Sequence, residues 1–291
     1  IIAPSGSDDP FYYQIEQHYG SSDHEVFNHW STHVPGVMLI TWPDLYYHTS
    51  EDIPNKLDPT QLKRATIIAA AGAYTIASAD EDMAISIANT SFSYASKRMG
   101  VELARAFDEL QKSNSENFEA ICKKVNSYLE AATNNERATL LSISELEPHS
   151  EKLQSHLSLL VESLEQNYET NGTLLKSQMK IVASKLGVNT PLLNLSKLEK
   201  NADEIIPVPA DILKESGFGI ERTIRELSKE TIDKYSYRSI ASTTELCALI
   251  NGNNSVLDIK KMLDTQYKKE SDLQDIINYL ELLKMKDLVI F

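Results

Sequence analysis

The sequence lacks any apolar stretch long enough to span a membrane, and it is poor in basic residues. A membrane-spanning helix needs about 20 consecutive apolar residues, whereas the longest apolar run near the beginning covers only 67–71 before Gly72 and Ala73. Lys and Arg total 28 against 42 Asp and Glu, a formal net charge of −14. Because phosphate backbones are bound by clustered cations, we expect neither membrane insertion nor a general role on nucleic acid.

Cysteine is scarce too, with two residues in the whole sequence. Cys122 and Cys247 stand far apart and match no spacing of metal ligands. They leave open one disulfide or two free thiols, and we favour free thiols.

The sequence begins at Ile1-Ile2 without an initiator Met, a basic segment or a signal-peptide pattern. We therefore expect a cut inside a larger protein. The compartment stays open, since a signal peptide on the missing part would imply a secreted or periplasmic protein.

Composition divides the 291 residues into regions of different character. The first is rich in Pro, His, Trp and Tyr, and the second is poor in Gly and Pro. We predict an α/β fragment, the end of a sheet domain, followed by mostly α appendages. The predicted boundaries are 1–80 for the α/β part, 81–200 for a helical bundle, 201–219 for a linker and 220–291 for a winged-helix-like module.

The first region carries one strand signal and one helix signal. Residues 34–40 are apolar and β-branched around a turn signal, which predicts a short buried strand. A polar loop follows over 42–58. Asp58 is a suitable N-cap and Pro59 a suitable first helical residue. The apolar spacing from Leu62 to Ile76 predicts a helix, and its many alanines would let it lie close against a sheet.

The later regions read as helices. Segments 101–111, 117–132 and 152–165 are amphipathic, and 174–186 ends at Gly187, a suitable C-cap. Their apolar stripes suit either a core or partner helices, and we favour a core.

The C-terminal region has a different order of predicted elements. Helices are expected over 243–250, 256–266 and 271–284, with Ser255 as an N-cap, before a strand at 288–291. This order, with the segments 250–252 and 256–259, resembles the winged-helix modules of PqqD-like peptide-binding domains. DNA binding is the usual role of a winged helix, but the third helix is too acidic to bind phosphates well. We favour a packing role.

His48 is the first candidate for a metal ligand in this region. It lies in a loop of aromatic and acidic residues directly after the predicted strand, where sites form in open α/β sheets. A neutral imidazole can bind a metal ion while a carboxylate such as Asp52 fixes its tautomer. A single His by spacing alone is also compatible with a structural role.

Four pieces of this region, in order, resemble the final metal-ligand loop of the co-catalytic zinc exopeptidases of metallopeptidase family twenty-eight. The pieces are 22–27 (Ser-Asp-His-Glu-Val-Phe), 34–37 (Val-Pro-Gly-Val), 46–52 (Tyr-Tyr-His-Thr-Ser-Glu-Asp) and 58–59 (Asp-Pro). That family includes leucine aminopeptidases, glutamate carboxypeptidases and glutaminyl cyclases. The resemblance covers roughly the first 80 residues.

The resemblance implies two zinc ions, bridged by an Asp and a water, with a Glu as general base. His48 matches the last zinc ligand, and Tyr47 matches a residue whose hydroxyl stabilises the oxyanion. Tyr47 would otherwise be an aromatic packed at the loop base. Asp23 and His24 match the substrate side of the cleft, or else a turn cap and a surface histidine. His29 and His33 match no ligand position, and we expect both to be structural.

The remaining ligands and the base of that family would precede Ile1, and no His-x-Asp or Glu-Glu pair follows residue 52. One His cannot hold a catalytic zinc. We therefore expect this chain alone to be inactive and the intact protein to be a zinc aminopeptidase acting on peptides, completed by the missing N-terminal part. Two alternatives remain open: a non-catalytic interaction protein that forms a homo-oligomer, and a glutaminyl-cyclase-like acyl transfer on the same scaffold.

Overall fold

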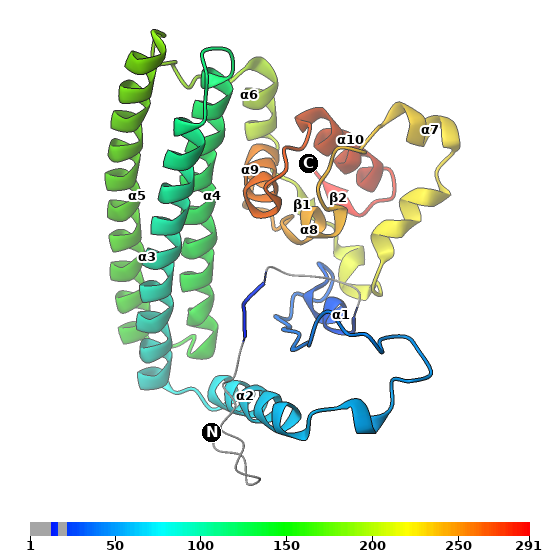
Figure 1. The fold of residues 1–291 in the computed structure, drawn as a ribbon. Coiled ribbons are helices and arrows are strands. Elements are labelled where there is room, and N and C mark those ends of the chain that lie inside the picture. The colour runs from blue at the N-terminus through cyan, green and yellow to red at the C-terminus, as the bar shows by residue number, and fades with distance from the viewer. Residues whose placement is uncertain (1–12, 17–21) are drawn as a thin grey trace.

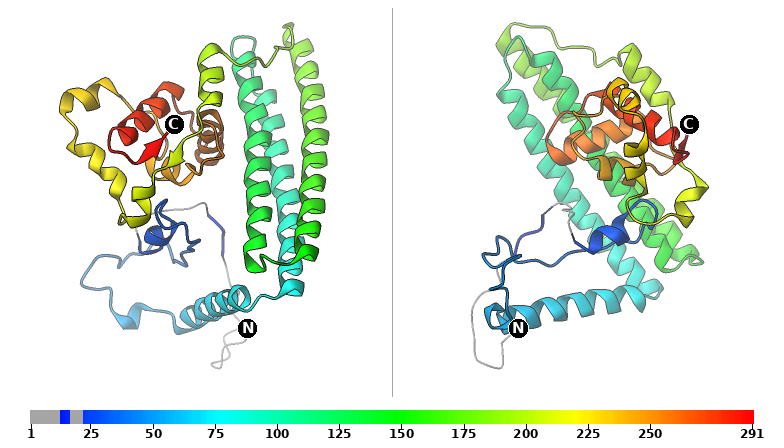
Figure 2. Two further views of the ribbon diagram at one scale, coloured as in Figure 1. Left: turned by 180° about the vertical axis from the view of Figure 1, so that it is seen from behind. Right: turned by 90° about the vertical axis from the view of Figure 1, so that its right-hand side faces the viewer.

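The computed structural model describes residues 13–16 and 22–291, which form three parts (Figure 1). Three long helices, α3 (Glu81–Gln111), α4 (Phe118–Ser142) and α5 (Glu151–Leu186), lie side by side. A C-terminal unit, residues 197–291, packs beside them, and Figure 2 shows the same neighbours from two further directions. The described part of the N-terminal region, which we call the N-terminal segment (13–16 and 22–77), runs past the end of both. No helix among the described residues has the length and apolarity that crossing a bilayer would require.

The bundle helices begin and end at residues that satisfy their terminal backbone groups. The carboxylate of Asp80 accepts a hydrogen bond from the N–H of Met83, and the hydroxyl of Ser150 accepts one from the N–H of Leu153. α5 ends at Gly187, whose φ of 68° lies in the left-handed region. Glycine adopts this conformation without the cost of a Cβ clash, so the predicted C-cap is confirmed.

α5 corrects one prediction, because segments 152–165 and 174–186 belong to a single helix. Gly172 lies within it and leaves the helix unbroken. A glycine in a helix costs about 1 kcal/mol relative to alanine. Leu164 and Leu175, on either side of it, are both fully buried against the other bundle helices. Burial of such side chains contributes about 1.5–3 kcal/mol each, which outweighs the glycine.

The stripe of leucines on α5 forms core, as predicted. Leu153, Leu157 and Leu164 are buried against α3 and the end of α4. A polar link joins the helices as well: the guanidinium of Arg98 donates two hydrogen bonds, of 2.5 and 2.7 Å, to the buried carboxylate of Glu136. The second region is therefore a closed three-helix bundle.

The C-terminal unit is built from short helices around one core. Its elements are α6 (Lys197–Glu204), β1 (Val208–Pro209), η3 (Asp211–Glu215), η4 (Ile220–Glu226), α7 (Lys229–Lys234), α8 (Thr243–Ala248), α9 (Val256–Tyr267), α10 (Leu273–Lys284) and β2 (Val289–Ile290). Ser255 caps α9 in a reciprocal capping box with Asp258, which confirms that N-cap. The strands pair antiparallel, with Val208 opposite Ile290.

The expected linker, 201–219, carries structure of its own. α6 crosses the expected boundary at residue 200 and ends at Glu204, and its Ala202 is buried in the core of the C-terminal unit. Leu213 of η3 lies in the same core. The three helices α8, α9 and α10 followed by β2 confirm the predicted order of elements. The winged-helix identity and the domain boundaries stay predictions.

The N-terminal segment corrects the strand prediction. Residues 34–40 form no strand, and Val37 is 88% exposed. A strand needs a neighbour to pair with, and the only sheet among the described residues is β1–β2. The α/β part of the predicted fold is accordingly not confirmed, and the described chain is mostly helical.

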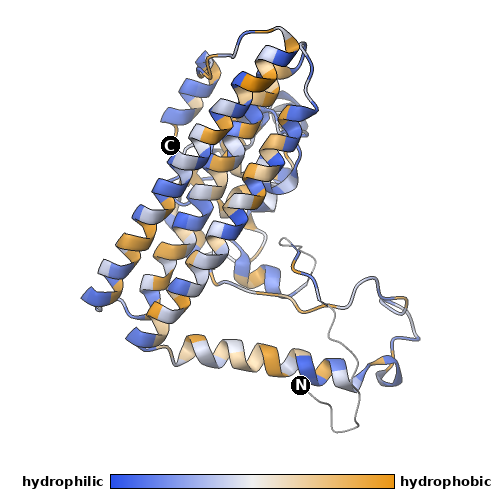
Figure 3. Cartoon of the chain, turned by 60° about the vertical axis from the view of Figure 1, so that its left-hand side comes forward, coloured by the Kyte–Doolittle hydropathy of each residue, from blue (hydrophilic) through white to orange (hydrophobic). Residues whose placement is uncertain are grey.

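α2 (Pro59–Ala77) begins as predicted but packs differently. The carboxylate of Asp58 accepts hydrogen bonds from the N–H groups of Thr60 and Gln61, which confirms the N-cap. The expected contact with a sheet is missing, since Leu62, Ile68 and Tyr74 all lie exposed on this helix. Figure 3 shows α2 crossing apart from the bundle with apolar residues along its surface.

Both cysteines are free and buried, which confirms the reading as two thiols. Burial raises the pKa of the Cys122 thiol to about 11, and burial also raises the pKa of the Cys247 thiol. Because the thiolate is the reactive form, we expect neither thiol of the native chain to react with a disulfide reagent at about pH 8. Two thiols per chain should react once the protein is unfolded; rapid reaction of a native thiol would contradict their burial.

Candidate functional site

The loop that carries His48 is shaped by local hydrogen bonds. The carboxylate of Asp44 accepts from the N–H of Tyr46 at 2.8 Å. The hydroxyl of Thr49 donates to the carbonyl of Tyr46 at 2.7 Å, and the N–H of Thr49 donates to the same carbonyl at 3.0 Å. These bonds close a turn around Tyr46–Thr49. Short polar side chains that bond to nearby backbone are typical of such turns.

His48 lies within this turn and has an unusual backbone conformation. Its φ is 59°, in the left-handed region that non-glycine residues seldom adopt. The imidazole is stacked on the ring of Tyr47, with centroids 3.8 Å apart and an interplanar angle of 19°. Trp42 contacts the same tyrosine edge-on, at 5.5 Å between centroids. Rare backbone conformations cluster at functional sites, and here one presents an exposed imidazole beside a phenol.

Zinc does not fit the described residues by themselves. Within residues 13–16 and 22–291, no three His, Cys, Asp or Glu side chains are grouped as a metal ion would require. A catalytic zinc needs three protein ligands. His48 can therefore supply one ligand, and the described residues supply no completed shell around it.

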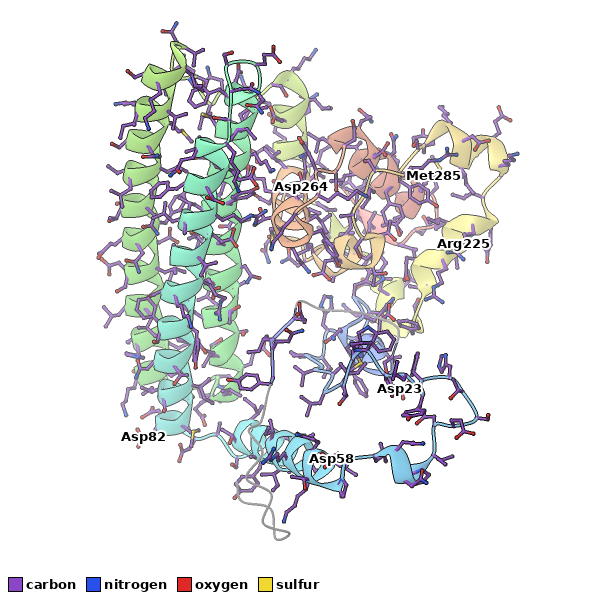
Figure 4. The ribbon with its side chains drawn as sticks, viewed as in Figure 1. Asp23, Asp58, Asp82, Arg225, Asp264 and Met285 are labelled. Atoms are coloured by element: carbon purple, nitrogen blue, oxygen red, sulfur yellow. The ribbon has the colours of Figure 1, made fainter. Side chains whose placement is uncertain are left out.

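Asp23 and His24 lie at the beginning of α1 (His24–Asn28), where Figure 4 labels Asp23. Asp23 occupies the N-cap position, yet its carboxylate makes no capping hydrogen bond and is exposed. His24 is half-buried. The structure thus brings Tyr47 and His48 together in one loop and places Asp23 and His24 on another element, α1.

Asn28 fixes the end of α1 against the following turn, a link that sequence reasoning missed. Its side-chain amide donates to the carbonyl of Gly36 at 2.9 Å and accepts from the N–H of Gly36 at 2.5 Å. A Cβ at position 36 would lie 3.2 Å from the carbonyl oxygen of His24, so glycine suits this close approach. The motif pieces 22–27 and 34–37 are therefore held against each other.

A second cluster joins the N-terminal segment to the C-terminal unit. His29 and Trp30 are both buried, with 2% of each residue exposed, and Trp30 lies in the core of the C-terminal unit. The Nε2 atom of His29 is 2.8 Å from Oε2 of Glu221, on η4. The indole N–H of Trp30 donates to the same oxygen at 3.3 Å. The structural role expected for His29 is confirmed, whereas nothing in the sequence pointed to Glu221.

A pocket of about 300 Å³ lies beside this cluster. It is lined from the N-terminal segment by Glu25, Asn28, His29 and Gly36 and from α8 by Thr244, Glu245 and Ala248. Neither the Tyr47–His48 pair nor Asp23 or His24 lines it.

Comparison with known families supports the peptidase resemblance for the first region. Residues 2–73 match the model of peptidase family M28. The match contains Asp23, His24, Tyr47 and His48 and ends within α2. No curated protein and no solved structure matches the chain. The match supports a hydrolase of the metallopeptidase class for this segment, in a family that is generally zinc-dependent.

Proposed function

We propose that the N-terminal segment is the C-terminal portion of a zinc aminopeptidase domain, in which His48 is one metal ligand. The observation that carries this proposal is the exposed Tyr47–His48 pair, set on a hydrogen-bonded turn within the residues that match the M28 family. An imidazole with an accessible nitrogen is the commonest protein ligand for a metal. His48 is exposed and has a left-handed backbone, and its ring is stacked on Tyr47.

The neighbouring residues have chemistry that suits a peptide substrate. The hydroxyl of Tyr47 is a donor that could stabilise the negative charge of a tetrahedral intermediate if it is held in place. Stacking on His48 and the edge contact with Trp42 restrict its ring. Asp23 and His24 are assigned to the substrate side of the cleft, where an exposed carboxylate would attract the ammonium group of a peptide N-terminus.

The surface of the N-terminal segment supports a domain completed by further polypeptide. Val37, Leu39 and Ile40 are exposed in one stretch, and α2 exposes Leu62 and Tyr74. Clusters of exposed large apolar side chains are typical of an interface. We assign its partner to the missing N-terminal part of the same protein, whose sheet would cover this surface and whose side chains would complete the zinc shell. The chain alone is then inactive.

The natural full-length gene product tests this function. We expect it to release amino acids from the N-terminus of unblocked peptides, to lose that activity after dialysis against a chelator, and to regain it with zinc. Residues 1–291 alone should show none. Cyclisation of N-terminal glutaminyl peptides without hydrolysis would instead support the acyl-transfer alternative. The absence of both activities in a folded, zinc-loaded full-length protein would exclude the proposal.

A further inference from the structure

We propose that His29, Trp30 and Glu221 form an acid-sensitive latch that holds the N-terminal segment on the C-terminal unit. The three side chains join elements far apart in the sequence, since 192 positions separate His29 from Glu221. Oε2 of Glu221 accepts hydrogen bonds from the imidazole of His29, at 2.8 Å, and from the indole N–H of Trp30, at 3.3 Å. One carboxylate oxygen therefore organises both anchoring side chains. The latch is independent of the proposed zinc chemistry.

The position of the shared proton follows from the surroundings of the imidazole. The N–H of Ser31 donates to Nδ1 of His29 at 3.2 Å, and the hydroxyl of Ser31 lies 2.6 Å from the same atom. Nδ1 is thus an acceptor, and a neutral ring then carries its proton on Nε2. The N–H of Gly219 also approaches Nε2, at 3.2 Å, but the shorter contact with the ionised oxygen of Glu221, at 2.8 Å, places the proton on Nε2. A proton is required between Nε2 and the carboxylate at 2.8 Å, and His29 donates it.

Glu221 is ionised when the latch is closed. Burial raises its pKa, but the interactions with His29, with its own backbone N–H and with Trp30 together outweigh burial, so the pKa lies below the ordinary value of 4.5. A carboxyl group with a lowered pKa contributes stability that is present above its ordinary pKa and is lost as the pH falls through the lowered value. The latch therefore stays closed near neutral pH and opens in acid, below 4.5.

Protonation of Glu221 weakens both bonds of the latch at once. The same oxygen accepts from the imidazole of His29 and from the indole of Trp30. Hydrogen bonds to an ionised acceptor are about twice as strong as those between neutral groups. Loss of this charge in acid therefore favours release of residues 22–36 into water.

Other titratable or charged groups lie around the latch on η4, α1, α8 and α10. Glu25 of α1 and Glu245 of α8 line the pocket beside His29. The guanidinium of Arg222, on η4, lies over the ring of Phe218, 5.2 Å from its centroid. Phe218 in turn contacts the imidazole of His29 edge-on. Cys247 of α8 and Tyr279 of α10 face Glu221, and burial raises the pKa of both, so they are neutral here.

Tryptophan fluorescence can follow the latch, because the chain has two tryptophans and only Trp30 is buried in the described structure. In a Trp42→Phe background, Trp30 is the sole emitter. We expect its emission to stay blue from about pH 7 to about pH 5, and to shift to longer wavelength with greater quenching by acrylamide below 4.5. Circular dichroism recorded in parallel should show the helices still folded.

Two further variants identify the responsible carboxylate. Glu221→Gln mimics the protonated carboxyl and cannot titrate, so Trp30 emission should already lie at longer wavelength at about pH 7 and should change little below 4.5. Glu226→Gln is the matched control on the same η4 element, because Glu226 pairs with Lys286 at 2.9 Å, away from the latch. It should retain the shift. Trp30 emission that changes only when helicity is lost, or an unchanged acid shift in Glu221→Gln, would overturn the latch.

Discussion

Replacement of His48 by alanine is expected to lower the proposed aminopeptidase activity of the full-length protein by more than about 100-fold. Mutation of a residue that only supports a metal ligand lowers metal affinity or activity by about 10–100-fold. His48 is proposed to be a ligand itself, so a larger loss is expected. The imidazole is exposed and stacked on Tyr47, so its removal should leave the fold intact. The rate of release of the N-terminal residue from a peptide, measured at saturating and low substrate, gives the loss.

His33 provides a matched control for this variant. It lies in the same segment, is exposed, and has a left-handed φ of 53°, close to the 59° of His48. His33→Ala should keep most of the activity, since this histidine matches no ligand position. Equal activity of His48→Ala and His33→Ala would remove His48 from the site.

Replacement of Trp30 by alanine is expected to have the largest effect on stability. Trp30 is 2% exposed within the core of the C-terminal unit, next to buried residues of η4, α8 and α10. Truncation of a buried tryptophan costs about 3–5 kcal/mol through lost burial and the cavity left behind. We expect the free energy of unfolding of the full chain to fall by this amount in denaturant titrations followed by circular dichroism.

Trp42 is the control for Trp30. It is 62% exposed, and its contact is with Tyr47 of the same loop. Surface substitutions of this kind change stability by about 0.5 kcal/mol or less. If Trp30→Ala and Trp42→Ala have equal effects on the unfolding midpoint, the N-terminal segment is not anchored through Trp30.

Helix ends were the most predictable part of the fold, because their signals are local. Asp58 before Pro59, Ser255 before α9 and Gly187 after α5 all act within a few residues of themselves. Helix continuity was less predictable. Separate helices were predicted over 152–165 and 174–186, and only the burial of Leu164 and Leu175 on either side of the polar stretch between them shows why α5 continues.

The strand expected over 34–40 failed for a different reason. Apolar β-branched sequence shows that a segment can pair, but pairing needs a neighbouring strand, and the described residues offer none there. The exposed side chains of this stretch and of α2 have the same cause, because 34–40 was predicted to be a buried strand and α2 to lie against a sheet.

The candidate site shows the same limit. Tyr47 and His48 are adjacent in sequence, so their pairing in one loop could be foreseen from the motif. Glu221 could not, because its partners lie far away along the chain and its neighbourhood, Gly219 to Glu226, resembles an ordinary polar turn. Long-range polar pairs depend on how separate elements dock, which periodicity and caps do not encode.

Zinc content measured by mass spectrometry is the most direct test of the assignment of His48. The natural full-length protein, His33→Ala and His48→Ala would be purified identically and equilibrated with a weak chelator at increasing strength. We predict that the first two retain zinc to the same chelator concentration and that His48→Ala releases it at a much lower one. Identical retention by all three proteins would contradict a metal-binding role for this histidine.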